Sequence, residues 1–201
     1  MEPYQGATIS GSIVQAPVIP FSWGNTTGQI SVSGSKAHIA SGVSGSSGKG
    51  FYREGDYGPM KVAGWISIDN RRADQRIWFG FQDDPIPASA SYGVICEFSG
   101  TVASSAAFVT FFHGEEERTE FAIPSGSTAS QLKYTIQVTP ENCKLEVGTD
   151  TVATHELHIP GPYDEMALCA GFEVLQDSDE SIASIDCILF QNFNLIATKL
   201  Y

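Results

Sequence analysis

Apolar and polar residues alternate most clearly in residues 132–160, which read LKYTIQVTPENCKLEVGTDTVATHELHIP. Its segments YTIQV and KLEV place an apolar side chain at every second position, and the polar tetrad GTDT separates them from a third extended segment that stops at Pro160. Such alternation over short runs, interrupted by turn residues, is typical of strands that bury one face. Residues 132–160 therefore predict an antiparallel meander of two or three strands.

The same alternation recurs along the chain, and no useful stretch has the 3.6-residue period of a helix. Outside the meander it predicts strands at residues 18–23, 29–33, 37–40, 60–69, 75–82, 92–98, 107–112, 119–123, 166–175 and 182–193. About 12 to 14 strands at this spacing predict an all-β fold, a two-sheet antiparallel sandwich of jelly-roll type. Composition does not break along the chain, so we expect one domain over residues 1–201.

Glycine and serine are concentrated near the N-terminus, where they change this picture locally. The segment SGVSGSSGKG, residues 41–50, is a flexible loop by composition. Residues 1–50 are therefore expected to form a loose arm ahead of the sandwich.

Assigning alternate residues of each strand to opposite faces predicts a continuous apolar face and hence a core. Its expected members are Val62, Ile66, Ile68, Ile77, Phe79, Phe81, Val94, Phe98, Tyr134, Ile136, Val138, Leu145, Leu168, Phe172 and Leu189. Alternation places Cys96, Cys143 and Cys187 on the same strand faces as apolar residues, and none of the four cysteines has metal-ligand or CxxC spacing. We interpret these three as small buried hydrophobic residues rather than as disulfide partners.

Several segments carry a resemblance to a known family. They are GWISIDN at 64–70, RIWFGFQDD at 76–84, YGVICEF at 92–98, the meander, and MALCAGFEV at 166–174. Their order resembles the concanavalin A-like lectin/glucanase jelly roll, particularly its laminin-G-like members, over roughly residues 60–193. The resemblance implies a sandwich with one concave sheet face.

A second, more polar surface appears on the side of the strands opposite the apolar face. Trp65, Trp78, Glu97 and Glu173 fall on this side of four separate strands. Sugars are bound by aromatic faces that stack on C–H patches and by carboxylates that accept hydroxyl hydrogen bonds. These four residues are thus the candidate ligand-binding site, on the concave face. The competing interpretation is that the two tryptophans only cover the second face of a sheet.

Three classes of function fit this surface. The preferred hypothesis is a non-catalytic recognition module that binds carbohydrate. A glycoside hydrolase would use Glu97 and Glu173 as its carboxyl pair, but the glucanase-type E-x-D-x-x-E strand signature is missing. A structural or assembly domain of a viral or cell-surface appendage would instead form a homo-oligomer.

No cofactor is predicted, and metal candidates are weak. Asp83 and Asp84 at a strand end, with Asp177 and Asp179 in the QDSDES loop, offer the hard oxygen ligands that suit calcium. Calcium is also the metal that the resemblance implies most often. Acidic loops of an acidic protein are more often only solvated, so no metal site is assigned.

Two other polar groups are interpreted structurally. His155 and His158 are three apart in an extended segment and point to opposite faces, which argues against a shared zinc ion. The three glutamates of HGEEER, residues 113–118, are interpreted as the charged tip of a hairpin.

The acidic net charge of the chain limits the classes of partner that we expect it to bind. Eleven basic against 23 acidic residues give a net charge of −12, and the basic residues are scattered. Phosphate binding needs clustered lysine and arginine, so nucleic acid and anionic membranes are disfavoured. No apolar run is long enough for a membrane span, and residues 1–20 show no signal peptide. We expect a glycan or another protein as partner, at an extracellular or virion surface.

Overall fold

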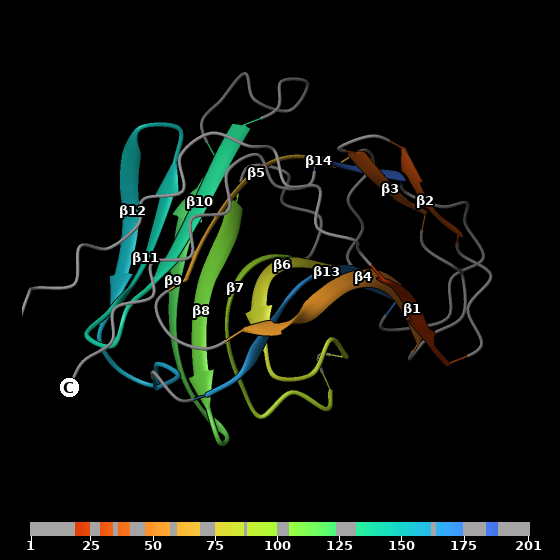
Figure 1. Cartoon of the computed structure of the whole chain (residues 1–201). Helices are drawn as coiled ribbons and strands as arrows, with labels where there is room; N and C mark the ends of the chain where they lie inside the picture. The colour runs from red at the N-terminus through yellow and green to blue at the C-terminus, as the bar shows by residue number, and fades with distance from the viewer. Residues whose placement is uncertain are drawn as a thin grey trace, which may run out of the picture.

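The computed structural model describes residues 19–24, 29–33, 36–40, 47–56, 60–68, 75–86, 88–99, 105–123, 132–161, 164–174 and 184–188. Every regular element in these ranges is a strand, as the alternating pattern predicts (Figure 1). The strands are β1 Ile19–Trp23, β2 Gln29–Ser33, β3 Lys36–Ala40, β4 Ser47–Asp56, β5 Met60–Ile68, β6 Gln75–Gln82, β7 Tyr92–Ser99, β8 Ser105–Phe112, β9 Glu115–Ala122, β10 Leu132–Val138, β11 Cys143–Val147, β12 Asp150–His155, β13 Met166–Val174 and β14 Ser184–Ile188. Among the described residues, no helix is long and apolar enough to cross a membrane.

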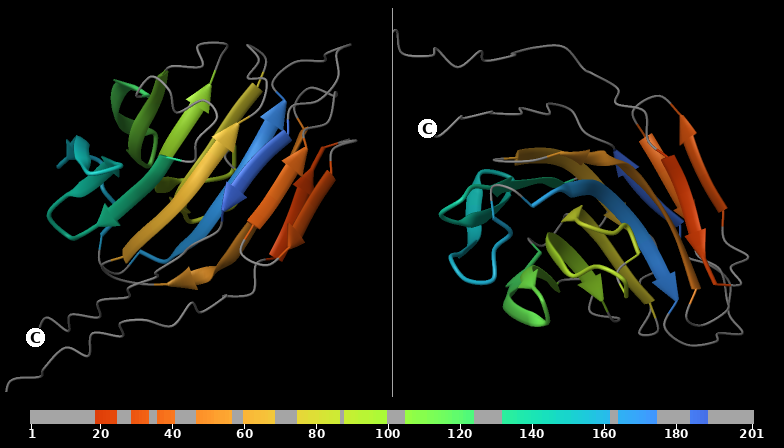
Figure 2. Two further views of the ribbon diagram at one scale, coloured as in Figure 1. Left: turned by 90° about the horizontal axis from the view of Figure 1, so that it is seen from above. Right: turned by 60° about the horizontal axis from the view of Figure 1, so that its bottom comes forward.

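The strands form two antiparallel sheets, which confirms the predicted two-sheet sandwich (Figure 2). The first sheet has the order β1-β4-β13-β6-β7-β8-β9, and the second has the order β12-β11-β10-β5-β14-β3-β2. The meander of residues 132–160 becomes β10, β11 and β12, which pair in succession at one side of the second sheet. Among the described strands, six of the twelve neighbouring pairs are not consecutive in sequence, and the chain passes repeatedly between the two layers.

The core lies between the sheets and contains the predicted apolar face. The confirmed buried members are Val62, Ile77, Phe79, Phe81, Val94, Phe98, Tyr134, Ile136, Val138 and Leu145. Side chains of the other predicted members, Ile66, Ile68, Leu168, Phe172 and Leu189, lie outside the described residues. Tyr134 of the second sheet packs edge-on against Phe79 and Phe98 of the first, with ring centroids 6.0 and 5.5 Å apart.

The three cysteines whose side chains the structure describes are buried, and none of them forms a disulfide. Cys96 and Cys143 belong to the core, as predicted, and Cys169 is buried on the other face of the first sheet. Burial raises the pKa of the Cys143 and Cys169 thiols to about 12. The side chain of Cys187 lies outside the described residues.

The strands described within residues 19–50 depart from the expectation of a loose arm, and residues 1–18 lie outside the described residues. Strands β1 and β4 belong to the first sheet, and β2 and β3 belong to the second. Residues 47–50, expected in a flexible loop, begin β4, which pairs on both sides with β1 and β13. Pairing with two neighbours satisfies the backbone hydrogen bonds of this Gly/Ser-rich segment, so tertiary context overrides its composition.

Two strand ends also differ from expectation. The turn between β8 and β9 is made by His113 and Gly114, whose φ angles are 50° and 91°. Positive φ at both positions permits a two-residue hairpin, so Glu115 already pairs with Phe112 and the three glutamates lie in β9 rather than at its tip. Strand β12 ends at His155, and His158 beyond it has a φ of 51°.

Candidate functional site

Three of the four predicted site residues share one sheet. Trp78 in β6, Glu97 in β7 and Glu173 in β13 belong to the first sheet, whereas Trp65 in β5 belongs to the second. Trp78 is directly opposite Glu97 in the register, and Glu173 is opposite Arg76, two residues along β6. The expectation that all four share one face is therefore wrong for Trp65. Alternation assigns a residue to a face, but not to one of two sheets.

Trp78 is covered on the outer face of the first sheet, the face away from the core. Only 1 % of Trp78 is exposed. The ring of Trp23 lies over it with centroids 5.8 Å apart, and Phe21 stacks on Trp23 at 5.5 Å with an interplanar angle of 14°. Tyr52 packs edge-on against Phe21 at 5.9 Å. We call these four residues the aromatic cluster; its members from β1 and β4 are only half-buried.

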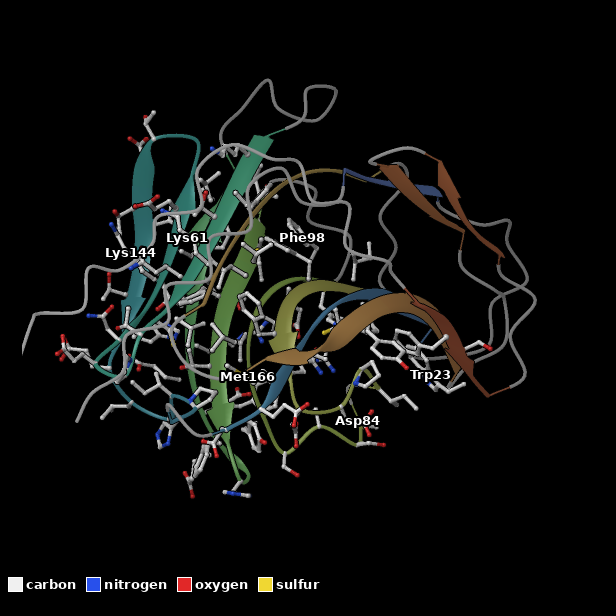
Figure 3. All side chains as sticks on the ribbon, viewed as in Figure 1. Trp23, Lys61, Asp84, Phe98, Lys144 and Met166 are labelled. Atoms are coloured by element: carbon white, nitrogen blue, oxygen red, sulfur yellow. The ribbon has the colours of Figure 1, made fainter. Side chains whose placement is uncertain are left out.

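Glycines make room for the aromatic cluster. Gly48 and Gly50 of β4 stand between β1 and β13 on the outer face, opposite Trp23 and Phe21 in the register. On the next strand, β13, Gly171 is opposite Gly50 on one side and opposite Trp78 on the other. All three glycines are buried. Because they carry no side chain, aromatic rings from β1 can lie across the neighbouring strands, and Trp23, labelled in Figure 3, contacts Trp78.

Sequence reasoning missed this contribution of β1 and β4, although a signal was present. Phe21 and Trp23 alternate in one strand, as do Gly48 and Gly50 in the next. Such complementary alternation of large and small residues suits adjacent strands. The two glycines were assigned to a loop, so their pairing with the aromatic strand was not predicted.

Glu97 is the centre of an ion-pair network beside the aromatic cluster. Its Oε2 accepts a hydrogen bond from Arg76 Nε at 2.8 Å, and its Oε1 accepts one from Arg118 Nη2 at 2.9 Å. Arg118 Nε also donates to Glu120 Oε1 at 2.8 Å. Arg118 reaches Glu97 diagonally from β9 across β8, where Ala107 is opposite Glu97 and Val109 is opposite Arg118.

The network keeps Glu97 ionised. Burial of the carboxylate by itself raises the pKa of Glu97, but the charges and hydrogen bonds of Arg76 and Arg118 outweigh it and lower the pKa below 4.5. A carboxyl group that protonates a glycosidic leaving group needs a raised pKa. Glu97 is thus poorly suited to act as a general acid. Its predicted partner Glu173 is described only by its place in β13.

The calcium candidates described here have structural partners. Asp83 Oδ1 accepts hydrogen bonds from the backbone N–H groups of Ser91 and Tyr92, at 2.9 and 3.1 Å. Asp84 Oδ1, labelled in Figure 3, accepts one from the Ile86 N–H at 2.8 Å. Both carboxylates therefore organise the connection between β6 and β7. Asp177 and Asp179 lie outside the described residues, and no group of three metal-ligating side chains occurs in the parts of the chain that the structure describes.

His155 is buried with both ring nitrogens engaged. Its Nδ1 is 3.0 Å from Thr110 Oγ1, and its Nε2 is 2.9 Å from Thr119 Oγ1. Thr110 donates its own proton to the Leu157 carbonyl, so Nδ1–H donates to Thr110 and Nε2 accepts from Thr119. The ring joins β12 of the second sheet to β8 and β9 of the first, which is a structural role.

Comparison with known proteins identifies the fold. No model of a protein family and no curated protein sequence matches this chain. A solved glycosidic hydrolase matches with a TM-score of 0.64 and 12 % identity, covering 90 % of this chain and 91 % of that one. The Bacillus licheniformis β-glucanase matches with a TM-score of 0.63 and 10 % identity, covering 92 % and 97 %. The chain therefore has a concanavalin A-like jelly-roll fold.

The same fold also occurs in a protein named for recognition rather than hydrolysis. The Emp47p carbohydrate recognition domain matches with a TM-score of 0.59 and 9 % identity, covering 82 % of this chain and 85 % of that domain. The concanavalin A-like fold is thus shared by hydrolases and by carbohydrate-binding domains. Which role a given chain has depends on its site and not on its fold.

Proposed function

We propose that this protein is a non-catalytic carbohydrate-binding module that holds a glycan on the outer face of the first sheet. The observation that carries this proposal is the aromatic cluster. Phe21, Trp23 and Tyr52 stand half-buried on a sheet face that the second sheet does not cover. Half-buried aromatic rings beside charged hydrogen-bonding groups are a combination suited to sugars.

The geometry of Trp23 supports a stacking role. Phe21 on one side and Trp78 beneath restrict the indole of Trp23, so little side-chain entropy remains to be lost when a sugar binds. The glycines beneath keep the rings close to the sheet, which leaves the space above them for a ligand. The glycan-related names of the structural neighbours are consistent with a carbohydrate ligand.

The ion-pair network supports a role without hydrolysis. Both oxygens of Glu97 are engaged by arginines, and the pKa of Glu97 is lowered. A hydrolase would need one carboxyl group kept protonated near neutral pH. The E-x-D-x-x-E strand signature of the glucanases is also absent from the sequence.

Affinity electrophoresis in gels containing neutral polysaccharides tests the proposal. Mixed-linkage β-glucan, xyloglucan, galactomannan, dextran and hydroxyethyl-cellulose supply a range of backbones. We expect at least one polymer to retard the wild type and Trp23→Ala to weaken that binding about tenfold or more, the effect of losing roughly 1.4 kcal/mol of stacking. Reducing-sugar release is expected to stay at background.

Trp65→Ala is the matched control, because it removes the same side chain from a strand of the other sheet. If the aromatic cluster is the binding site, only Trp23→Ala should weaken polysaccharide binding. The sequence-based hypothesis that Trp65 belongs to the site predicts a loss with Trp65→Ala as well. Retardation by no polymer, together with a stable oligomer in light scattering, would favour the alternative of a structural or assembly domain.

A further inference from the structure

The ion-pair network lies on the same sheet face as the aromatic cluster and is not needed to explain stacking. Trp78 faces Glu97 directly across β6 and β7, and Arg76 is two residues away on the same face. From β1 to β7 the sheet spans four strand spacings, roughly 19 Å. That distance suits an oligosaccharide chain rather than a single sugar, so a glycan on Trp23 would extend over the network.

We infer that Glu97 determines the specificity of this face by occupying its two arginines, which closes the site to acidic glycans and leaves neutral glycans as its ligands; the inference rests on the proposed function. Arginine is the side chain best suited to bind carboxylates and sulfates, through paired charge-assisted hydrogen bonds. Without Glu97, Arg76 and Arg118 would lose the carboxylate that they share, and the face would carry one negative charge less beside its aromatic rings.

The contacts show that Glu97 engages both arginines at once. One carboxylate bridges both guanidinium groups, at 2.8 Å to Arg76 and 2.9 Å to Arg118, and Glu120 takes a second N–H of Arg118. Two cations are thus matched by two anions, so the network has no net positive charge. An acidic sugar would have to compete with a carboxylate that is already held in place within the same molecule.

Burial favours Glu97 over an acidic sugar in the competition for the two arginines. The Glu97 side chain is 8 % exposed, whereas the Arg76 and Arg118 side chains are 30 and 31 % exposed. The carboxylate is therefore covered, while part of each arginine side chain remains exposed. Neutral hydroxyl groups can accept hydrogen bonds there without displacing Glu97. The net charge of −12 adds a long-range repulsion against polyanions that weakens as salt is added.

Matched polymer pairs test the inference in the full chain. Hydroxyethyl-cellulose and carboxymethyl-cellulose share a backbone and differ in charge, and dextran and dextran sulfate form a second pair. We expect the wild type to prefer the neutral member of any pair that it binds. Glu97→Gln keeps the side-chain shape and removes the charge. It should shift the ratio of anionic to neutral binding about fivefold or more toward the anionic polymer, because the carboxylate that both guanidinium groups share loses its charge.

Two further measurements sharpen the result. Glu120→Gln removes only the exposed partner of Arg118 and should give a smaller shift than Glu97→Gln. Added salt should abolish the gain, since it arises from charge. Thermal unfolding verifies that each variant is folded. If Glu97→Gln does not fold, Glu120→Gln decides instead, and the absence of any shift toward the anionic polymer in that variant overturns the inference.

The outcomes separate the inference from the proposed function. A wild type that binds the anionic polymer as strongly as its neutral partner, or a folded Glu97→Gln variant with no shift toward the anionic polymer, overturns the inference and leaves carbohydrate binding intact. A wild type that binds no glycan at all contradicts the proposed function, and the inference falls with it.

Discussion

The two faces of the first sheet bury neighbouring residues of one strand for different purposes. On β6, Phe79 faces the core and is 2 % exposed, whereas Trp78 faces outward and is 1 % exposed. Phe79 is covered by the second sheet, including Tyr134, so its burial holds the two layers together. Trp78 is covered by side chains of the edge strand β1.

This difference separates a face that holds the two layers together from the face that we propose binds a ligand. The cover of the inner face is a whole sheet, and removing part of it leaves a cavity. The cover of the outer face is a few half-buried rings, which remain accessible to a ligand. Equal burial of two residues therefore does not imply an equal role. The predictions below test this comparison, beginning with the largest expected effect.

Truncating the inner face should be the most damaging change. Phe79→Ala removes a ring packed between the sheets and should lower the free energy of unfolding by about 3–5 kcal/mol, because it combines lost apolar burial with a cavity. Urea denaturation measures this loss. Leu157→Ala is the control, since Leu157 is 61 % exposed and should change stability by no more than about 0.5 kcal/mol. A loss below roughly 1 kcal/mol for Phe79→Ala would show that the inner face does not carry the stability.

The ion pairs on the outer faces of the two sheets should contribute different amounts to the free energy of unfolding. This difference should be smaller than the loss caused by Phe79→Ala. Glu97→Gln leaves two partly buried arginines without their common carboxylate and should cost about 1–3 kcal/mol of unfolding free energy. On the second sheet, Glu146 pairs with Lys144 at 2.7 Å, but these side chains are 32 and 34 % exposed. Glu146→Gln should therefore cost only about 0–1 kcal/mol. Equal losses in urea denaturation would mean that burial does not distinguish the two pairs.

The smallest effect concerns pH and a polar contact between the sheets. Burial lowers the pKa of His155 below 6.5, although Glu117 acts in the opposite direction. In the unfolded chain, His155 therefore takes up a proton near pH 6.5, whereas in the folded protein it stays neutral to a lower pH. The resulting stability is present above that pH and falls as the pH decreases toward the folded pKa.

Denaturation midpoints between pH 7.5 and 5.5 measure this slope. His155→Gln should reduce the slope in this window, whatever it does to stability itself. Glu97 does not contribute here, because its pKa is lowered from 4.5 and its stabilising effect is lost only under more acidic conditions. An unchanged slope in His155→Gln would contradict a neutral His155 between the sheets.

Local sequence pattern predicted much of the fold because strand periodicity is a local property. The segments YTIQV and KLEV became β10 and β11 with the expected residues buried, and β6 has the predicted bounds. The pattern failed where pairing overrides composition, as in β4, and where backbone conformation sets a turn, as at His113 and Gly114.

The candidate site was predicted only in part. Alternation identified Trp78, Glu97 and Glu173 as outward-facing residues of neighbouring strands, but it also included Trp65, which lies in the other sheet. It did not identify Phe21 and Trp23, because their contact with Trp78 joins strands more than fifty residues apart in sequence. The Glu97–Arg118 pair was missed for the same reason, since it spans an intervening strand.

The sequence by itself determined which residues form strands, which side of each strand is apolar, and that the protein is acidic. These properties depend on neighbouring residues and on composition. Only the tertiary structure decided which strands pair, and therefore that β1 covers Trp78 and that one carboxylate joins two arginines. Those contacts depend on strand order and register, which long-range backbone pairing sets and which two-residue periodicity does not encode.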